Sequence, residues 1–445
     1  MTGKHGFTHR SRPTHAQGTL GLKELIAMGV GGMIGGGIFS VLGLAVSISG
    51  HAAPIAFAIG GIVALTAGYS YVKLALAYRD DGASFTYLER AFPKQPNVAG
   101  VVGWTVILGY IGTLALYAFT FGAYGAELFD MGSAANVRML LSASIILFFM
   151  LINLMGAKAS GDAEDLVVYT KIILLTLLAI AGLSTVKHAN LFPVFDKGVP
   201  SVFMAGALIF VAYEGFQLIT NAVTETRDPE KNIPRGIYGS VGIVAFIYVT
   251  LAVVGVGSLP LDQLVAAEEY ALAVAAEPAL GDAGRVLVAI AALLATSSAI
   301  NATMFGAARM MAEMTRSKKM PHAFSFRNRV NVPWVAVVAL TVFALSLTLL
   351  GGLELIASFS SMTFLLVSIG VSVANIRLRA KTHSKIGLIL PGFCLMLATV
   401  ATLVYYLWHT ARPTLLWILG MYVAVFIMEF VFSKRGLLYR GKKGA

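Results

Sequence analysis

Charged residues and cysteine are both scarce in this chain. Only 12% of the 445 residues are charged and 57% are hydrophobic, whereas soluble domains carry about 25% charged residues. This composition excludes an ordinary soluble domain and predicts a protein that crosses a membrane several times. The single cysteine, Cys394, excludes an intramolecular disulfide bond.

Sequence motifs for enzyme chemistry are also missing. No Lys-Ser or Lys-Thr follows the glycine-rich stretch, so it is no nucleotide-binding loop, and the eight histidines lie mostly in tails and loops. We find neither a cluster of metal ligands nor a nucleophile beside a base. The sequence therefore predicts no enzyme, no metal and no cofactor. The net charge of +11 indicates attraction to an anionic membrane leaflet rather than binding of nucleic acid.

Apolar runs predict an all-α integral membrane protein with twelve spans. A spanning helix needs about 20 residues, and most of the 33 lysines and arginines fall in alternate loops and in both tails. The positive-inside rule therefore predicts that both termini are cytoplasmic. The predicted spans are 22–48, 53–78, 98–129, 136–156, 164–186, 201–223, 236–258, 284–314, 334–351, 353–376, 386–408 and 413–433.

The first span contains six glycines between Gly29 and Phe39. Each glycine costs a helix up to about 1 kcal/mol relative to alanine, so we expect the helix to break there. In a membrane, such a break is tolerated where it is buried in protein or lines a watery cavity. The alternative is a packing face, because Gly32 and Gly36 have the four-residue spacing of closely packed helices.

The sixth span has an interruption of its own, where Glu214 stands beside Gly215. An acidic residue near the middle of a membrane is costly unless it faces a polar cavity. The two interruptions lie five spans apart, and because five is odd, the second group of five spans is inverted relative to the first. Interrupted segments at matching positions of two inverted halves indicate the binding site of a secondary transporter.

Lys171 is the most informative single charge, because it lies inside the fifth span among apolar residues. An ammonium at that depth must find polar partners or lose its proton, and lysine changes its protonation readily when it is desolvated. We therefore interpret Lys171 as a functional residue. The alternative is a lysine that reaches the membrane interface or forms a structural pair.

Three stretches, 31–39, 210–216 and 225–237, resemble the amino acid–polyamine–organocation (APC) superfamily. The resemblance is closest to the ApcT-type proton-coupled amino acid transporters, which carry a lysine where Lys171 stands. It implies the LeuT fold, with two inverted repeats of five helices followed by two more. On that basis the chain divides into a cytoplasmic tail (1–20), the first repeat (21–190), the inverted repeat (191–380), helices 11 and 12 (381–435) and a second tail (436–445).

The resemblance implies a secondary active transporter of the plasma membrane that couples amino acid uptake to protons by alternating access. Amide groups freed in the first span suit a carboxylate, and carbonyl groups freed in the sixth suit an ammonium. Tyr110, Tyr117 and Tyr124 recur every seven residues on one face of the third span, and we expect the first of them at the site. The expected substrate-binding residues are Met33, Ile34, Gly35, Gly36, Gly37, Tyr110, Phe210, Val211, Tyr213, Glu214 and Phe216.

Coupling is expected to involve Lys171. In sodium-coupled relatives a cation lies between the first and eighth spans, where Thr296, Ser297 and Ser298 offer oxygens. If Lys171 projects into the same place, its ammonium repels sodium at short range, and these oxygens form a vestigial cation site. We hypothesise that Lys171 binds and releases the coupling proton and, when charged, contacts carbonyl oxygens near Gly31.

Glu214 departs from the family pattern, which usually places an apolar residue there. It has three possible roles: it binds a substrate amine or a cationic substrate, it is a second proton carrier, or it hydrogen-bonds the broken helix. A carrier of amines, polyamines or cationic amino acids, or an antiporter, is therefore the alternative to a carrier of neutral amino acids. A sensor that binds amino acids without moving them is a further alternative.

Overall fold

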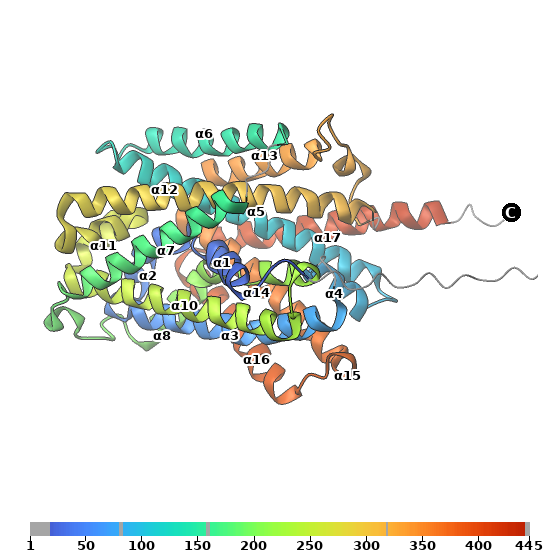
Figure 1. Cartoon of the computed structure of the whole chain (residues 1–445), viewed down its shortest axis with the longest axis horizontal. Coiled ribbons are helices and arrows are strands. Elements are labelled where there is room, and N and C mark those ends of the chain that lie inside the picture. The colour runs from blue at the N-terminus through green and yellow to red at the C-terminus, as the bar shows by residue number, and fades with distance from the viewer. Residues whose placement is uncertain (1–17, 80–82, 157–160, 317–318, 441–445) are drawn as a thin grey trace, which may run out of the picture.

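The computed structural model describes residues 18–79, 83–156, 161–316 and 319–440, and all regular structure within these ranges is helical apart from one isolated bridge between Leu20 and Thr226. Most long helices run along the longest axis of the molecule (Figure 1). Ten segments are long and apolar enough to cross a membrane, and Trp334–Leu350 is a shorter apolar helix. The all-helical membrane protein is thus confirmed, whereas the count of twelve spans and the LeuT fold stay predictions.

The α-helices follow one another along the chain with short connections. Most of the predicted N-terminal tail and the last five residues of the C-terminal tail lie outside the described residues. The helices are α1 (Leu22–Met33), α2 (Gly37–Ser49), α3 (Ala53–Tyr78), α4 (Ala83–Ala91), α5 (Pro96–Glu127), α6 (Ala135–Leu154), α7 (Gly161–Leu183), α8 (Val199–Leu208), α9 (Leu218–Asn221), α10 (Pro229–Ser258), α11 (Leu261–Ala267), α12 (Ala271–Arg316), α13 (Trp334–Leu350), α14 (Leu353–Arg377), α15 (Arg379–Thr382), α16 (Ile386–Thr410) and α17 (Arg412–Arg440).

Each predicted apolar run coincides with one of these helices or with a pair of them. The start of α12 differs most, because the helix begins at Ala271 rather than at residue 284. Helix α10 also begins early, at Pro229 rather than at residue 236. A proline is well tolerated at the first helical position, where its missing N–H has no partner within the helix. Pro234 lies inside the same helix, where it removes one backbone hydrogen bond without ending the helix.

Both predicted helix breaks are present. The first lies between the end of α1 at Met33 and the start of α2 at Gly37. In the second, α8 ends at Leu208 and a 3-10 turn, Ile209–Tyr213, follows before the short helix α9. The glycine-rich stretch is therefore a break in the helix and does not continue as an unbroken packing face.

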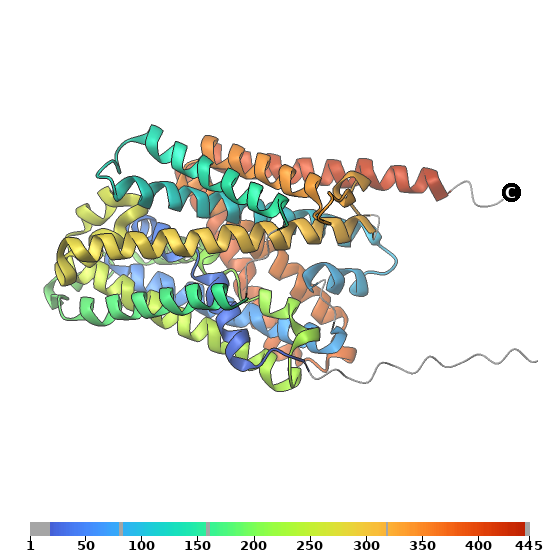
Figure 2. The same cartoon turned by 45° about the horizontal axis from the view of Figure 1, so that its top comes forward.

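The two broken segments lie in the middle of the helix bundle. Helix α1 packs against α10 and α7, and α2 packs against α8 and the 3-10 turn Ile209–Tyr213. Helices α6 and α13 lie side by side along one edge of the bundle in both views (Figures 1 and 2). The breaks are thereby enclosed by protein, which satisfies the requirement for irregular backbone in a membrane.

Two ion pairs lie close to the loop between α11 and α12. Arg285 on α12 contacts Glu127 at the end of α5, and Arg138 on α6 lies 2.6 Å from Glu269 in the 3-10 turn Glu268–Tyr270. The same turn packs against α2, where the backbone of Glu268 lies directly over Gly43. The Arg138–Glu269 pair and the packing on α2 hold the loop between α11 and α12 in place, and the Arg285–Glu127 pair joins α12 to α5.

Candidate functional site

The two helix breaks touch through glycine backbone. A Cβ atom added at Gly215 would lie 2.6 Å from the amide nitrogen of Met33 and 2.8 Å from the carbonyl oxygen of Gly32, closer than real side-chain atoms approach. Gly215 also has a φ of +134°, a conformation that residues with a side chain rarely adopt. Glycine at this position therefore lets the interrupted segments meet backbone to backbone.

Tyrosine hydroxyls satisfy backbone carbonyls that the breaks leave without helical partners. The hydroxyl of Tyr248 on α10 lies 2.8 Å from the carbonyl oxygen of Met33 and 3.3 Å from that of Ala212, so its single hydrogen serves both broken segments. The ring of Tyr117 on α5 lies against Gly35 and Gly36. These tyrosines hold the irregular backbone in place because an unpaired buried carbonyl is costly.

Substitution of Tyr248 by phenylalanine is expected to destabilise the protein. Loss of the hydroxyl leaves the carbonyl oxygen of Met33 buried without this partner, which costs about 1–3 kcal/mol. Thermal unfolding of the purified protein in detergent measures the effect. Tyr238→Phe is the matched control, because Tyr238 lies on the same helix and is partly exposed. Equal melting temperatures for the two variants would contradict the structural role of Tyr248.

Lys171 reaches the end of α1 from the neighbouring helix α7. Its Nζ atom donates hydrogen bonds to the carbonyl oxygens of Gly31, at 2.9 Å, and Ile34, at 2.7 Å. The side chain is 2% exposed. The structure thus brings together Lys171 and Gly31, the pair that sequence reasoning connected, whereas the role of the pair in coupling stays a prediction.

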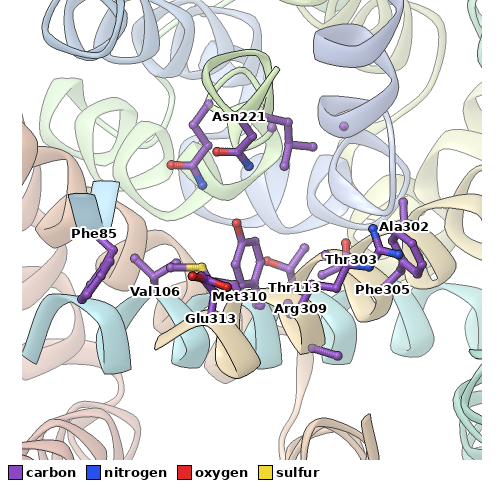
Figure 3. A pocket seen from close by; sticks show the side chains of 18 of the residues that line it. Phe85, Val106, Thr113, Asn221, Ala302, Thr303, Phe305, Arg309, Met310 and Glu313 are labelled. Atoms are coloured by element: carbon purple, nitrogen blue, oxygen red, sulfur yellow. The ribbon is translucent and has the colours of Figure 1, made fainter. Parts of the chain in front are cut away.

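A cavity of about 1170 Å³ begins at the two breaks and follows α12 toward the helix ends. Helix α1 contributes Met28, Gly31 and Gly32 to its wall, and α9 contributes Leu218 and Asn221. Among the described residues that line it, none comes from α2 or α8. Asn221 faces the side chains of α12 across the cavity (Figure 3). The cavity therefore reaches the breaks from the side of α1 and α9.

The predicted site residues divide into those that line the cavity and those that do not. Gly31, Tyr110, Glu214 and Ser298 line it, together with Val168, which covers Gly31 one turn before Lys171. The predicted residues that do not line it are Met33, Ile34, Gly35, Gly36, Gly37, Lys171, Phe210, Val211, Tyr213, Phe216, Thr296 and Ser297.

Sequence reasoning missed Tyr117, Thr113 and Gln217, which also line the cavity. A signal for Tyr117 was present, because it follows Tyr110 by seven residues and shares its helix face. Thr113 lies one turn from Tyr110 on the same helix. Helical spacing from Tyr110 would therefore have found two of the three.

The predicted cation-site residues lie on α12 with different surroundings. The hydroxyl of Thr296 is buried and donates to the carbonyl oxygen of Ala292 in its own helix, whereas Ser298 lines the cavity. Lys171 donates hydrogen bonds to the carbonyl oxygen of Gly31 in α1 and to that of Ile34 directly after it. Within the described ranges, no group of three or more His, Cys, Asp or Glu residues is placed to hold a metal ion.

Comparison with known proteins agrees with this architecture. A family model described as amino acid permease matches residues 20–433. An uncharacterized protein of Methanocaldococcus jannaschii is 32% identical over 420 residues, covering 93% of this chain and 95% of the relative. The inner membrane transport protein YbaT of Escherichia coli is 32% identical, with 93% and 96% covered. The branched-chain amino acid permease BcaP of Bacillus subtilis is 26% identical, with 81% of each chain covered.

The match extends over nearly the whole chain, including both helix breaks, Lys171 and the cavity. YbaT is named as a transport protein and BcaP as a permease, which together with the family model confirms the predicted family and agrees with the prediction that the chain is not an enzyme. The chain therefore belongs to the amino acid permease family of the APC superfamily and is a multi-pass membrane transporter of amino acids.

Proposed function

We propose that this protein takes up amino acids across the plasma membrane by alternating access and that a proton carried by Lys171 drives the uptake. The observation that carries the proposal is the pair of hydrogen bonds from Lys171 Nζ to Gly31 and Ile34 at the break between α1 and α2. A charged ammonium holds the end of α1 against α7. Loss of the proton removes the charge from these bonds and frees α1 to move.

The position of the cavity supports a transport cycle. The cavity meets the break beside Gly31, whose carbonyl oxygen receives Lys171. Substrate binding and the protonation of Lys171 thus act on the same end of α1. With both termini cytoplasmic, as the distribution of lysine and arginine predicts, the cavity on the side of α1 and α9 faces the cytoplasm. Residues 21–190 and 191–380 are then the two inverted repeats that share the site.

The broken helices themselves provide the proposed substrate groups. Amide groups between Met33 and Gly37 are suited to the carboxylate. Phe210, Val211, Tyr213 and Phe216 at the second break are proposed to contact the substrate once it enters between the breaks, although they do not line the cavity in the present conformation. In the present conformation Tyr117 covers Gly35 and Gly36. The tyrosine must move before a carboxylate can reach those amides.

Uptake into proteoliposomes tests the proposal. Labelled L-isoleucine is offered because BcaP is a branched-chain amino acid permease. L-alanine and L-serine are offered as smaller neutral amino acids. We expect at least one of them to accumulate when the lumen is more alkaline than the outside, and accumulation to stop when a protonophore removes the gradient. Accumulation that follows a sodium gradient and ignores the pH gradient would overturn proton coupling.

An amine or cationic amino acid carrier is the second candidate function. It is favoured by Glu214, an acidic side chain in the wall of the cavity. Labelled L-arginine and putrescine in the same proteoliposomes distinguish the two candidates, because a carrier of neutral amino acids accumulates neither of them.

A further inference from the structure

Glu214 is the buried charged residue in the wall of the cavity. It follows the 3-10 turn Ile209–Tyr213 and is 5% exposed. The other charged residues that line the described part of the cavity are all exposed and lie at helix ends or in loops. They are Arg79, Glu89, Arg90, Arg309, Glu313 and Arg327. The inner end of the cavity therefore presents an acid, and its mouth presents mostly arginines.

One oxygen of the Glu214 carboxyl, Oε1, is buried and has no hydrogen-bond partner among the described residues. Two of the neighbouring polar side chains are engaged elsewhere. The side-chain oxygen of Gln217 accepts from the hydroxyl of Tyr71 at 3.0 Å, and the hydroxyl of Tyr117 donates to the carbonyl oxygen of Gly32 at 3.4 Å. A buried acceptor without a donor is costly, so a ligand that brings a donor is strongly favoured here.

We propose that Glu214 binds the amino group of the substrate. The inference rests on the proposed transport of amino acids through this cavity and deepens it, because it names the group by which the site selects its ligands. An ammonium supplies both the missing hydrogen bond and the opposite charge. The ligand class is then primary amines, which includes amino acids with an unmodified α-amino group.

The backbone around Glu214 places this residue in the wall of the cavity. Gly215 turns the chain where the second break meets Gly32, and both glycines line the cavity beside Glu214. A role in holding the broken helix would place the carboxyl on its backbone N–H groups. The buried Oε1 instead has none of them as a partner within the described ranges.

Derivatives of single amino acids test the proposal. The probes are L-alanine, L-isoleucine and L-arginine, each beside its amide, which lacks the carboxylate, and its N-acetyl form, which lacks the ammonium. Competition against labelled substrate in counterflow gives the apparent affinities. In the wild type, we expect N-acetylation to weaken binding about tenfold or more, since a charge-assisted hydrogen bond is lost. Amidation is expected to weaken it less. The opposite order overturns the proposal.

Glu214→Gln extends the test to the residue itself. The parent amino acids and their amides are expected to lose about tenfold in affinity alike, so their advantage over the N-acetyl forms shrinks. Glu225→Gln is the matched control, because Glu225 is exposed and lies outside the cavity wall. An unchanged ratio of parent to N-acetyl form in Glu214→Gln overturns the role of Glu214.

Two failures remain distinguishable. If no amino acid drives counterflow in the wild type, the proposed transport function fails, whatever Glu214 does. If the wild type exchanges amino acids but tolerates N-acetylation, transport stands and the inference about Glu214 fails. Should Glu214→Gln not fold, Glu214→Asp replaces it, because the shorter side chain draws the carboxyl back from the ligand. An unchanged ratio of parent to N-acetyl form in that variant overturns the role of Glu214.

Discussion

Lys171→Ala is expected to abolish accumulation driven by a pH gradient while the protein still folds. Each hydrogen bond that involves a charged group is worth about 1.5–3 kcal/mol, and Lys171 makes two of them, to Gly31 and Ile34. Loss of both hydrogen bonds shifts the equilibrium away from the conformation in which α1 is held against α7, by roughly a hundredfold or more. Uptake in proteoliposomes, measured with and without an imposed pH gradient, gives the effect.

Lys171→Arg tests whether coupling needs the release of the proton or only the positive charge at this position. A guanidinium keeps its proton at any physiological pH, so this variant is expected to catalyse exchange of amino acids without coupling it to a pH gradient. Lys73→Ala is the matched control, because Lys73 also lies within an apolar helix but has its ammonium near the ring of Tyr69. Undiminished proton-driven uptake by Lys171→Ala would refute the role of Lys171.

Gly215→Ala is expected to cause the second large effect, on folding as well as on transport. The φ of +134° costs a residue with a side chain about 1–3 kcal/mol. The added methyl group also meets the backbone of Gly32 and Met33, and overpacking adds about 1–3 kcal/mol. Size-exclusion chromatography and thermal unfolding in detergent measure the loss of stability.

Gly242→Ala is the control for that substitution. Gly242 lies within α10, and a Cβ atom added there meets nothing within 4 Å. Alanine is favoured over glycine inside a helix by about 0.5–1 kcal/mol, so the control is expected to be as stable as the wild type or slightly more stable. If Gly215→Ala and Gly242→Ala have the same melting temperature, the two breaks do not need their close contact.

The helix breaks could be predicted from the sequence because their cause is local. Six glycines between Gly29 and Phe39 weaken one helix wherever it packs, and the structure ends α1 at Met33. The approach of Lys171 to α1 was expected from the resemblance to transporters that carry a lysine at this position. The chemistry of its own segment required only that the buried ammonium find polar partners or lose its proton.

The wall of the cavity could not be predicted in the same way. Gly35 and Gly36 were expected at the site, but the ring of Tyr117 from another helix covers them. Which helix face meets a cavity depends on how α5 and α12 are rotated against α1, and a sequence pattern does not fix that rotation. The pairing of Gly32 with Gly215 escaped prediction for the same reason, since it depends on the meeting of two distant segments.

The size and single-sided position of the cavity have a consequence for inhibition. Its volume of about 1170 Å³ exceeds the range typical of drug-binding pockets, about 300–1,000 Å³. A molecule much larger than a substrate could therefore fill it from the mouth and would stabilise this conformation in proportion to its affinity. The wall of the cavity is formed mainly by α1, α5, α9 and α12, and none of the described lining residues comes from α2 or α8. Such an inhibitor would therefore be selective for one conformation. Added substrate on the opposite side of the membrane would not displace it directly.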